Sequence, residues 1–357
     1  MLHDNNTPYA AIGFEQWHRG GQTMACIAVR AEMVFGDEGK VRLAEKQDIV
    51  LMDEFDGDPQ KTPLIRPNDL VPFKPGTDIT FLGSLHSPDK SPKPYLTGSI
   101  AIAGYKKSIR GYGPREWIKK GKTWILSDPE SISELPLCYT KASGGRFIGD
   151  PDGTIDPRNP IGANLIDTEF TPKSRTYAAA QIDNEDHPIH DNFQRPPLPQ
   201  GFGPMSPWWK ARQQYVGTYS EDWDWDSDAV PSLPKDFNYR FYNCAHPDLV
   251  FRGFWSGGNR IELTNLSPTG NIIFHLPKHQ PFARFSFTDG REVTAALNLD
   301  GIHIDFRTQP HRYALTWRGW IDICPAFYRI DLEYDTLEKI SDMALPVVCE
   351  EGLREPV

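Results

Sequence analysis

The alternation of apolar and polar positions along the chain predicts a protein built mainly from β-strands. From Arg260 onward, apolar residues recur at every second position in short runs separated by Gly- and Pro-containing turns, which is typical of antiparallel sheets in a sandwich or meander. Residues 22–35 are apolar on both faces, so we expect a central strand there, followed by a turn at 36–39 and a return strand at 41–43. Proline accounts for 32 of the 357 residues, and because it is excluded from helix interiors, we expect long Pro/Gly-rich loops and few short helices.

Two β-hairpins are predicted between residues 95 and 124. The first alternating segment is interrupted at Lys106-Lys107, where we place its turn. Trp117 and Trp124 bracket a second turn with a basic tip. The segment 62–75 carries four prolines, and we therefore expect it to lack regular structure.

The segment 136–166 stands out because it places three turn-forming clusters between two short apolar runs. The clusters are Gly144-Gly145, residues 150–153 and residues 159–162. Loops of this length in compact domains are either functional or disordered. The apolar residues at both ends indicate an ordered loop that is pinned to a core.

The length of the chain allows one large domain or two ordinary ones. Residues 168–195 are polar and weakly periodic, which predicts an extended arm, and residues 208–215 predict one short helix. A soft boundary near 195–205 would separate an N-terminal β-rich domain, 1–200, from a C-terminal region, 201–357. The alternative is that both halves share a single core.

Charge and cysteine content narrow the class of protein. The net charge of -10 argues against nucleic-acid binding, which requires a clustered basic surface. Seven basic residues between Lys106 and Lys122 are interpreted as solvated flanks of the hairpins, with a patch for a protein partner as the alternative. Five cysteines without a C-x-x-C pair indicate a reducing compartment. Since neither a signal-peptide pattern nor an apolar run of about 18 residues is present, we expect a cytoplasmic protein with no membrane contact.

Candidate catalytic and metal sites are weak. The sequence lacks the nucleophile elbow, the phosphate-binding loop and the zinc-protease helix motif. The histidines of the segment 187–190 would fall on opposite faces of an extended chain, with only Asp191 beside them. Asp150, Asp152 and Asp156 miss the spacing of a calcium loop, so we interpret them as turn formers and leave an ion site open. We expect no cofactor, no metal and no enzymatic activity.

Aromatic residues within loops indicate a recognition surface, since Trp and Tyr supply much of the binding energy at interfaces. Five acidic residues surround Trp223 and Trp225 in the segment 221–228. Because tryptophan faces can stack on sugar rings beside paired carboxylates, a carbohydrate-binding or glycoside-acting protein is the alternative function.

A set of short motifs is spread over roughly residues 20–320. The motifs comprise Asn68-Asp69-Leu70, Lys74-Pro75-Gly76-Thr77-Asp78, Gly83, Gly144-Gly145, Asn159-Pro160-Ile161-Gly162, Gly201-Phe202-Gly203-Pro204, Trp209, Arg212, Tyr215, Gly217-Thr218-Tyr219, Trp223, Leu233-Pro234, Asp236-Phe237, Arg240, Asn243, Ala245 and Trp317-Arg318-Gly319. Together they resemble a bacterial domain-of-unknown-function family encoded beside spike-protein genes in type VI secretion clusters. The chain departs from the pattern at Ser143, where an aromatic residue usually stands, and at Ala211, where a proline usually stands.

The resemblance implies a non-enzymatic adaptor or chaperone that binds a toxic effector in the cytoplasm and helps to load it onto the spike. Its partners would be the effector and the spike protein, with neither nucleic acid nor membrane involved. The partner-binding or motif positions would be Tyr139, Gly144, Gly145, Asn159, Pro160, Gly162, Gly201, Pro204, Trp209, Tyr215, Trp223, Trp225, Phe237 and Asn243. An immunity protein or a structural part of the secretion machine is a further alternative.

Overall fold

The structure is mainly β, as the sequence predicted. The computed structural model describes residues 1–19, 23–36, 40–150, 152–166, 176–186, 189, 196–219, 233–323 and 327–343. In this part of the chain the two α-helices are short, α1 (Lys210–Gln213) and α2 (Leu337–Asp342). Single 3-10 turns are formed by Tyr139–Lys141, Tyr239–Tyr242 and Pro247–Leu249. The predicted helix at 208–215 is therefore present in a shorter form.

The largest sheet has seven strands in the order β19-β7-β24-β25-β3-β2, with β4 beside β3. They are β2 (Ala10–Trp17), β3 (Thr23–Phe35), β4 (Val41–Leu43), β7 (Thr77–Leu82), β19 (Val250–Phe251), β24 (Asn298–Asp305) and β25 (Arg312–Asp322). Neighbours are antiparallel except β7 and β24, which are parallel. Because β3 is apolar on both faces, it lies buried between β2 and β25, which confirms the predicted central strand and its return strand.

A second, five-stranded sheet has the order β18-β10-β9-β20-β21. Its strands are β9 (Tyr95–Ile102), β10 (Tyr105–Tyr112), β18 (Ile182–Asn184), β20 (Arg260–Thr264) and β21 (Ile272–His275). Leu263 of β20 lies opposite Ile100 of β9, so strands from before and after residues 195–205 share this sheet. One continuous apolar core likewise draws on both halves of the chain, from Ile27 to Leu332.

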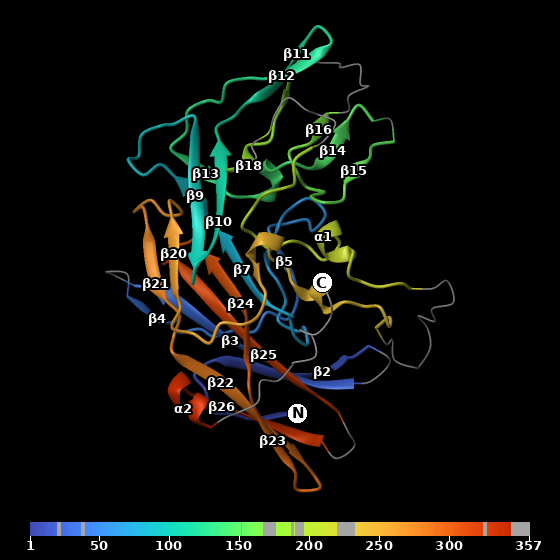
Figure 1. The fold of residues 1–357 in the computed structure, drawn as a ribbon, viewed down its shortest axis with the longest axis vertical. Helices are drawn as coiled ribbons and strands as arrows, with labels where there is room; N and C mark the ends of the chain where they lie inside the picture. The colour runs from blue at the N-terminus through green and yellow to red at the C-terminus, as the bar shows by residue number, and fades with distance from the viewer. Residues whose placement is uncertain are drawn as a thin grey trace.

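The four-stranded sheet, in the order β1-β26-β22-β23, lies at one end of the molecule (Figure 1). It comprises β1 (Leu2–Asn5), β22 (His279–Phe287), β23 (Glu292–Ala296) and β26 (Phe327–Thr336). Ile340 of α2 covers it by packing against Phe282 and Ala296. The strands from β20 to β26 match the predicted alternating runs of the C-terminal region.

Smaller sheets build the opposite end and the loops beside the core (Figure 1). They contain β5 (Glu54–Phe55) with β6 (Leu64–Arg66), β8 (Ser84–His86) with β13 (Glu134–Pro136), β11 (Glu116–Lys120) with β12 (Thr123–Leu126) and β17 (Thr176–Ala178), and β14 (Gly145–Ile148) with β15 (Ile155–Asp156) and β16 (Leu165–Ile166). The predicted hairpin between Trp117 and Trp124 is confirmed. Within the predicted arm, β17 and β18 pair with β11 and β10, and much of the rest of the arm lies outside the described residues.

The turn of the first hairpin was predicted three residues too late. The chain turns at Ala103-Gly104, both with positive φ, which is the two-residue turn that matches the twist of a hairpin. Lys106 and Lys107 instead belong to β10. Lys107 is buried, and its Nζ donates to Gln200 Oε1 and to Asp248 Oδ2, both at 2.8 Å.

Two of the seven basic residues between Lys106 and Lys122 are therefore buried, although all seven were interpreted as solvated. Besides Lys107, the buried Arg115 forms an ion pair with Asp183 at 2.9 Å. The expectation for residues 62–75 is also wrong in part, because Leu64–Arg66 form β6 between two prolines. Prolines flank this strand rather than interrupt it, and a strand tolerates that position.

Candidate functional site

The loop at 136–166 closes on itself through its Gly-rich motifs. Gly144 has a φ of +132°, and a side chain there would overlap the Asn159 carbonyl oxygen. A Cβ on Gly162 would lie 2.5 Å from the carbonyl carbon of Gly144. The Gly145 N–H donates to the Asn159 carbonyl at 2.7 Å. Glycine is required because two backbone segments pass in direct contact.

Asn159 fastens this loop to the 3-10 turn that begins at Tyr139. Its Nδ2 donates to the carbonyl oxygens of Tyr139 and Ser143, each at 2.9 Å, and the residue is fully buried. Pro160 follows and is half-buried. The motif residues of the loop therefore fix its shape from the inside.

The turn at Tyr139 brings the loop against the motif at 201–204. A Cβ on Gly201 would come within 2.8 Å of the Tyr139 ring, so only glycine allows the two segments to approach so closely. Tyr139 also meets Trp209 edge to face, with ring centroids 4.9 Å apart. Both aromatic residues are buried and support the loop as part of the core.

The remaining motif positions are also mostly internal. Phe237 lies in an aromatic cluster with Phe73 and Trp320. Tyr215 is half-buried, and its carbonyl accepts from the Asn238 N–H at 2.9 Å. Trp223 and Trp225 lie outside the described residues, as does the whole segment 221–228 of the carbohydrate alternative.

Motif residues from distant parts of the sequence meet in a buried network of charged and polar groups. Its members are Asp69, Lys74, Asp78, Asn243, Cys244, Asp300 and Arg318, all of them buried. The Lys74 Nζ donates to Asp78 Oδ2 at 2.7 Å. The Asn243 Nδ2 donates to Asp78 Oδ1 at 2.9 Å. Arg318 completes the network through ion pairs with Asp300 and Asp69.

Burial and pairing decide the charge states in this network. Burial would raise the pKa of Asp78, but the Lys74 ammonium and the hydrogen bonds outweigh it and hold that pKa below its ordinary value. Burial raises the pKa of the Cys244 thiol to about 12, against the opposing Lys74 charge. The thiol is therefore protonated at neutral pH and is not an activated nucleophile. The network holds the strands together rather than facing a substrate.

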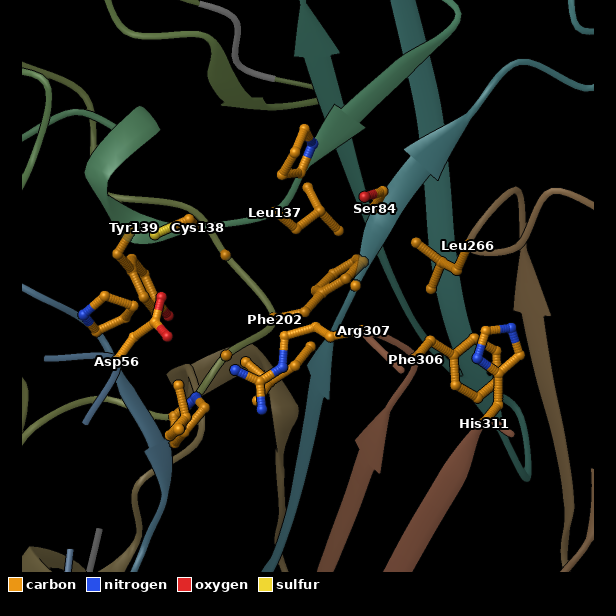
Figure 2. Close-up of a pocket in the computed structure, with 18 of the residues that line it drawn as sticks. Asp56, Ser84, Leu137, Cys138, Tyr139, Phe202, Leu266, Phe306, Arg307 and His311 are labelled. Atoms are coloured by element: carbon orange, nitrogen blue, oxygen red, sulfur yellow. The ribbon is translucent and has the colours of Figure 1, made fainter. Parts of the chain in front are cut away.

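A cavity of about 430 Å³ opens at the surface beside the loop (Figure 2). Apolar residues make up much of its wall: Leu82, Leu137, Tyr139, Phe202, Pro204, Leu266 and Phe306. Figure 2 shows Tyr139 and Asp56 on one side, Phe202 and Leu137 in the middle, and Phe306 with His311 on the other side. Two motif segments, around Tyr139 and at 201–204, thus form one wall of the cavity.

The polar groups of the cavity differ in whether they have partners. Arg307 donates from Nε and NH2 to the two carboxylate oxygens of Asp305, at 3.0 and 2.6 Å. The His311 ring stacks on Phe306 at 4.0 Å, and burial lowers the pKa of His311. By contrast, the exposed Asp56 and Glu134 have no side-chain hydrogen bond or ion pair within the described part of the chain.

Tyr139, Gly201 and Pro204 are among the predicted partner-binding positions, but no pattern along the chain indicates the cavity that they line. Asp56 directly follows strand β5, and Glu134 begins strand β13. No periodic pattern along the chain connects these two carboxylates. The motif at 201–204 was the one local signal, because its glycines mark close contact between segments. Phe306 was predicted only as part of an alternating strand, and no pattern singled out His311.

The aspartates that were candidates for binding a metal ion form local hydrogen bonds instead. Asp150 Oδ1 and Oδ2 accept from the backbone N–H groups of Asp152 and Thr154, at 2.9 and 3.0 Å. Asp156 accepts from Arg158, with a closest distance of 2.6 Å. These contacts are those of turn formers, as interpreted from the sequence. His187, His190 and Asp191 lie outside the described residues.

Comparison with other proteins gives a single result on family. Within the described residues, no helix combines the length and apolarity that crossing a membrane requires. No curated protein and no solved structure matches the chain significantly. A family model described as "uncharacterized protein conserved in bacteria (DUF2169)" matches residues 20–318, so the chain belongs to that bacterial family.

Proposed function

We propose that the protein is a non-enzymatic adaptor of a type VI secretion system that binds a toxic effector and helps to load it onto the spike. The observation that carries the proposal is the cavity between the loop at 136–166 and the motif at 201–204. It combines an aromatic wall with a polar rim, the composition of protein recognition sites. The assignment to a type VI secretion system rests on the resemblance of the sequence motifs to the family encoded beside spike-protein genes.

The rigidity of the cavity wall supports a binding role. Gly144, Asn159 and Gly201 fix the loop through close backbone contacts and buried hydrogen bonds. A wall that is already ordered loses little conformational entropy when a partner segment enters it. The charged groups shared by the motifs, such as Lys74 and Asp78, are buried and paired with one another, which fits a structural role for them.

Co-expression with the products of the neighbouring effector and spike genes tests the proposal. We expect a stable complex in affinity purification and size-exclusion chromatography, and we expect effector delivery to be lost when this gene is deleted. Ser84 lines the cavity, so Ser84→Phe should fill it and weaken the complex. Glu292→Phe, at an exposed position of strand β23, is the matched control. Absence of a complex together with unchanged delivery would overturn the proposal.

A further inference from the structure

We infer that the cavity selects a segment of the partner in which an apolar side chain is flanked by lysine or arginine. This inference rests on the proposed function, because it concerns the chemistry of the segment bound at the same site. The observations that carry it are the carboxylates Asp56 and Glu134, which have no hydrogen bond or close ion pair, the pairing of Arg307 with Asp305, and the apolar wall of the cavity.

Asp56 stands apart within an acidic segment. Residues 53–58 contain four carboxylates, and three of them have partners. The partnered groups are Asp53 with Asn68, Glu54 with Arg66, and Asp58 with Lys61. Asp56 has no side-chain hydrogen bond or close ion pair within the described residues, although it lines the cavity and feels the charge of Arg307 at longer range. The fold thus neutralises or satisfies its neighbours and leaves this carboxylate facing the opening.

Glu134 gives the rim a second unpaired carboxylate. It lies in β13, exposed, and likewise has no hydrogen bond or ion pair in the described part of the chain. Two histidines also line the cavity, His86 and His311, and burial lowers the pKa of both. They are therefore uncharged at neutral pH and do not neutralise the rim.

Arg307 is the arginine of the cavity, and it is already occupied. Its guanidinium forms a two-pronged contact with Asp305, the arrangement in which arginine binds a carboxylate most strongly. The lining therefore carries an excess of negative charge that a basic group on a ligand would balance. An acidic ligand would instead meet the negative charges of Asp56 and Glu134, while the guanidinium of Arg307 already binds Asp305.

A partly exposed aromatic pair includes the residue that precedes Asp56 in the sequence. Phe55, adjacent in sequence to Asp56, stacks on Trp208 with ring centroids 5.3 Å apart. Trp208 is 39% exposed, so its ring is available to an apolar or cationic side chain outside the cavity. A volume of about 430 Å³ is that of a site for a small ligand or for side chains, not for a folded domain.

Fluorescently labelled, end-capped peptides test the inference with the full-length protein. Three peptides share the core Leu-Phe and differ in the flanking residues, which are lysine, glutamine or glutamate. By fluorescence anisotropy at low salt, we expect the lysine-flanked peptide to bind roughly fivefold to tenfold more tightly than the glutamate-flanked one, since each exposed ion pair contributes about twofold to fivefold. High salt should reduce this preference.

Two double variants localise the charge effect. Asp56→Asn with Glu134→Gln should remove the preference for lysine flanks. Asp289→Asn with Glu292→Gln changes the net charge equally at exposed positions of another sheet, and should leave the preference intact. Equal binding of all three peptides, no binding of any, or a preference that survives the first double variant would each overturn the inference.

The same variants separate this inference from the proposed function. If the co-expressed effector forms a complex that the Asp56→Asn/Glu134→Gln variant does not weaken, the adaptor function stands and the inferred segment chemistry is wrong. If no complex forms with any variant, the adaptor function is wrong, and the peptide measurements still decide what the cavity binds.

Discussion

The Lys74 ammonium donates to the Asp78 carboxylate of strand β7 at 2.7 Å, and both side chains are buried. The other partners of Asp78 are distant in sequence, since Asn243 and Cys244 lie 165 and 166 residues after it. The pair therefore ties the segment before β7 to the chain that follows the 3-10 turn at Tyr239–Tyr242. We expect the pair to matter for stability because both charges are buried.

Replacing Lys74 by methionine should destabilise the protein strongly. The change leaves the Asp78 charge buried without its cation, which costs about 3–5 kcal/mol. Urea unfolding followed by tryptophan fluorescence measures the loss. The control is Lys46→Met, which removes a lysine from an exposed ion pair with Asp48 and should leave stability nearly unchanged. Equal losses in the two variants would show that the buried pair is not important.

Stability should fall as the pH is lowered below about 6.5 because of His246. Burial, with the charge of Lys107, lowers the pKa of this histidine to about 4 in the folded protein. The unfolded chain therefore binds more protons between pH 6.5 and 4, and this group contributes a loss of about 1.4 kcal/mol per pH unit there.

Chemical denaturation at pH 7, 6 and 5 measures this slope. His246→Asn should flatten it, since the variant lacks the group that takes up a proton on unfolding. His275→Asn, at an exposed position of β21, is the matched control. A slope that is identical in the wild type and in His246→Asn would contradict the assignment.

Gly144→Ala should open the loop at 136–166. The new methyl group meets the backbone of Asn159 in a conformation that only glycine adopts easily, and we expect a loss of about 3 kcal/mol. Gly270→Ala is the control that introduces backbone strain without a steric clash, because Gly270 has a φ of +89° and open space around it. That variant should lose only about 1 kcal/mol. Hydrogen exchange should show faster exchange at Gly145 and Gly162 in Gly144→Ala alone.

The adjacent tryptophans Trp208 and Trp209 should respond in opposite ways to alanine. Trp209 is 1% exposed and packs against Tyr139, so Trp209→Ala should cost about 3–5 kcal/mol of stability. Trp208→Ala should leave the melting temperature close to that of the wild type and weaken the complex with the effector. Melting curves and pull-downs on both variants check this, and a large drop in melting temperature for Trp208→Ala would place that ring in the core.

The strands were predictable where the signal is local. The two-sided apolar run of β3 and the period-two runs from Arg260 onward are visible within a few residues of sequence. Lys107 shows where this fails. From the sequence, a buried lysine cannot be distinguished from a lysine in a turn. The partners that allow Lys107 to be buried, Gln200 and Asp248, lie 93 and 141 residues away.

The candidate site was less accessible to prediction than the fold. Gly201 and Tyr139 could be singled out, since glycine and aromatic motifs mark close packing. Asp56 has no close ion pair because the nearby Arg66 and Lys61 pair with Glu54 and Asp58 instead. A property of this kind is set by tertiary structure and leaves no pattern along the chain.

The pairing of β3 with β25 has a consequence for how the protein is made. Val29 lies opposite Trp317, so the central strand emerges from the ribosome long before the strand that covers its other edge. Such non-local pairing folds slowly and leaves apolar edges exposed in the meantime. During synthesis, β3 therefore lacks its partner on that edge until residues 312–322 of β25 have been translated.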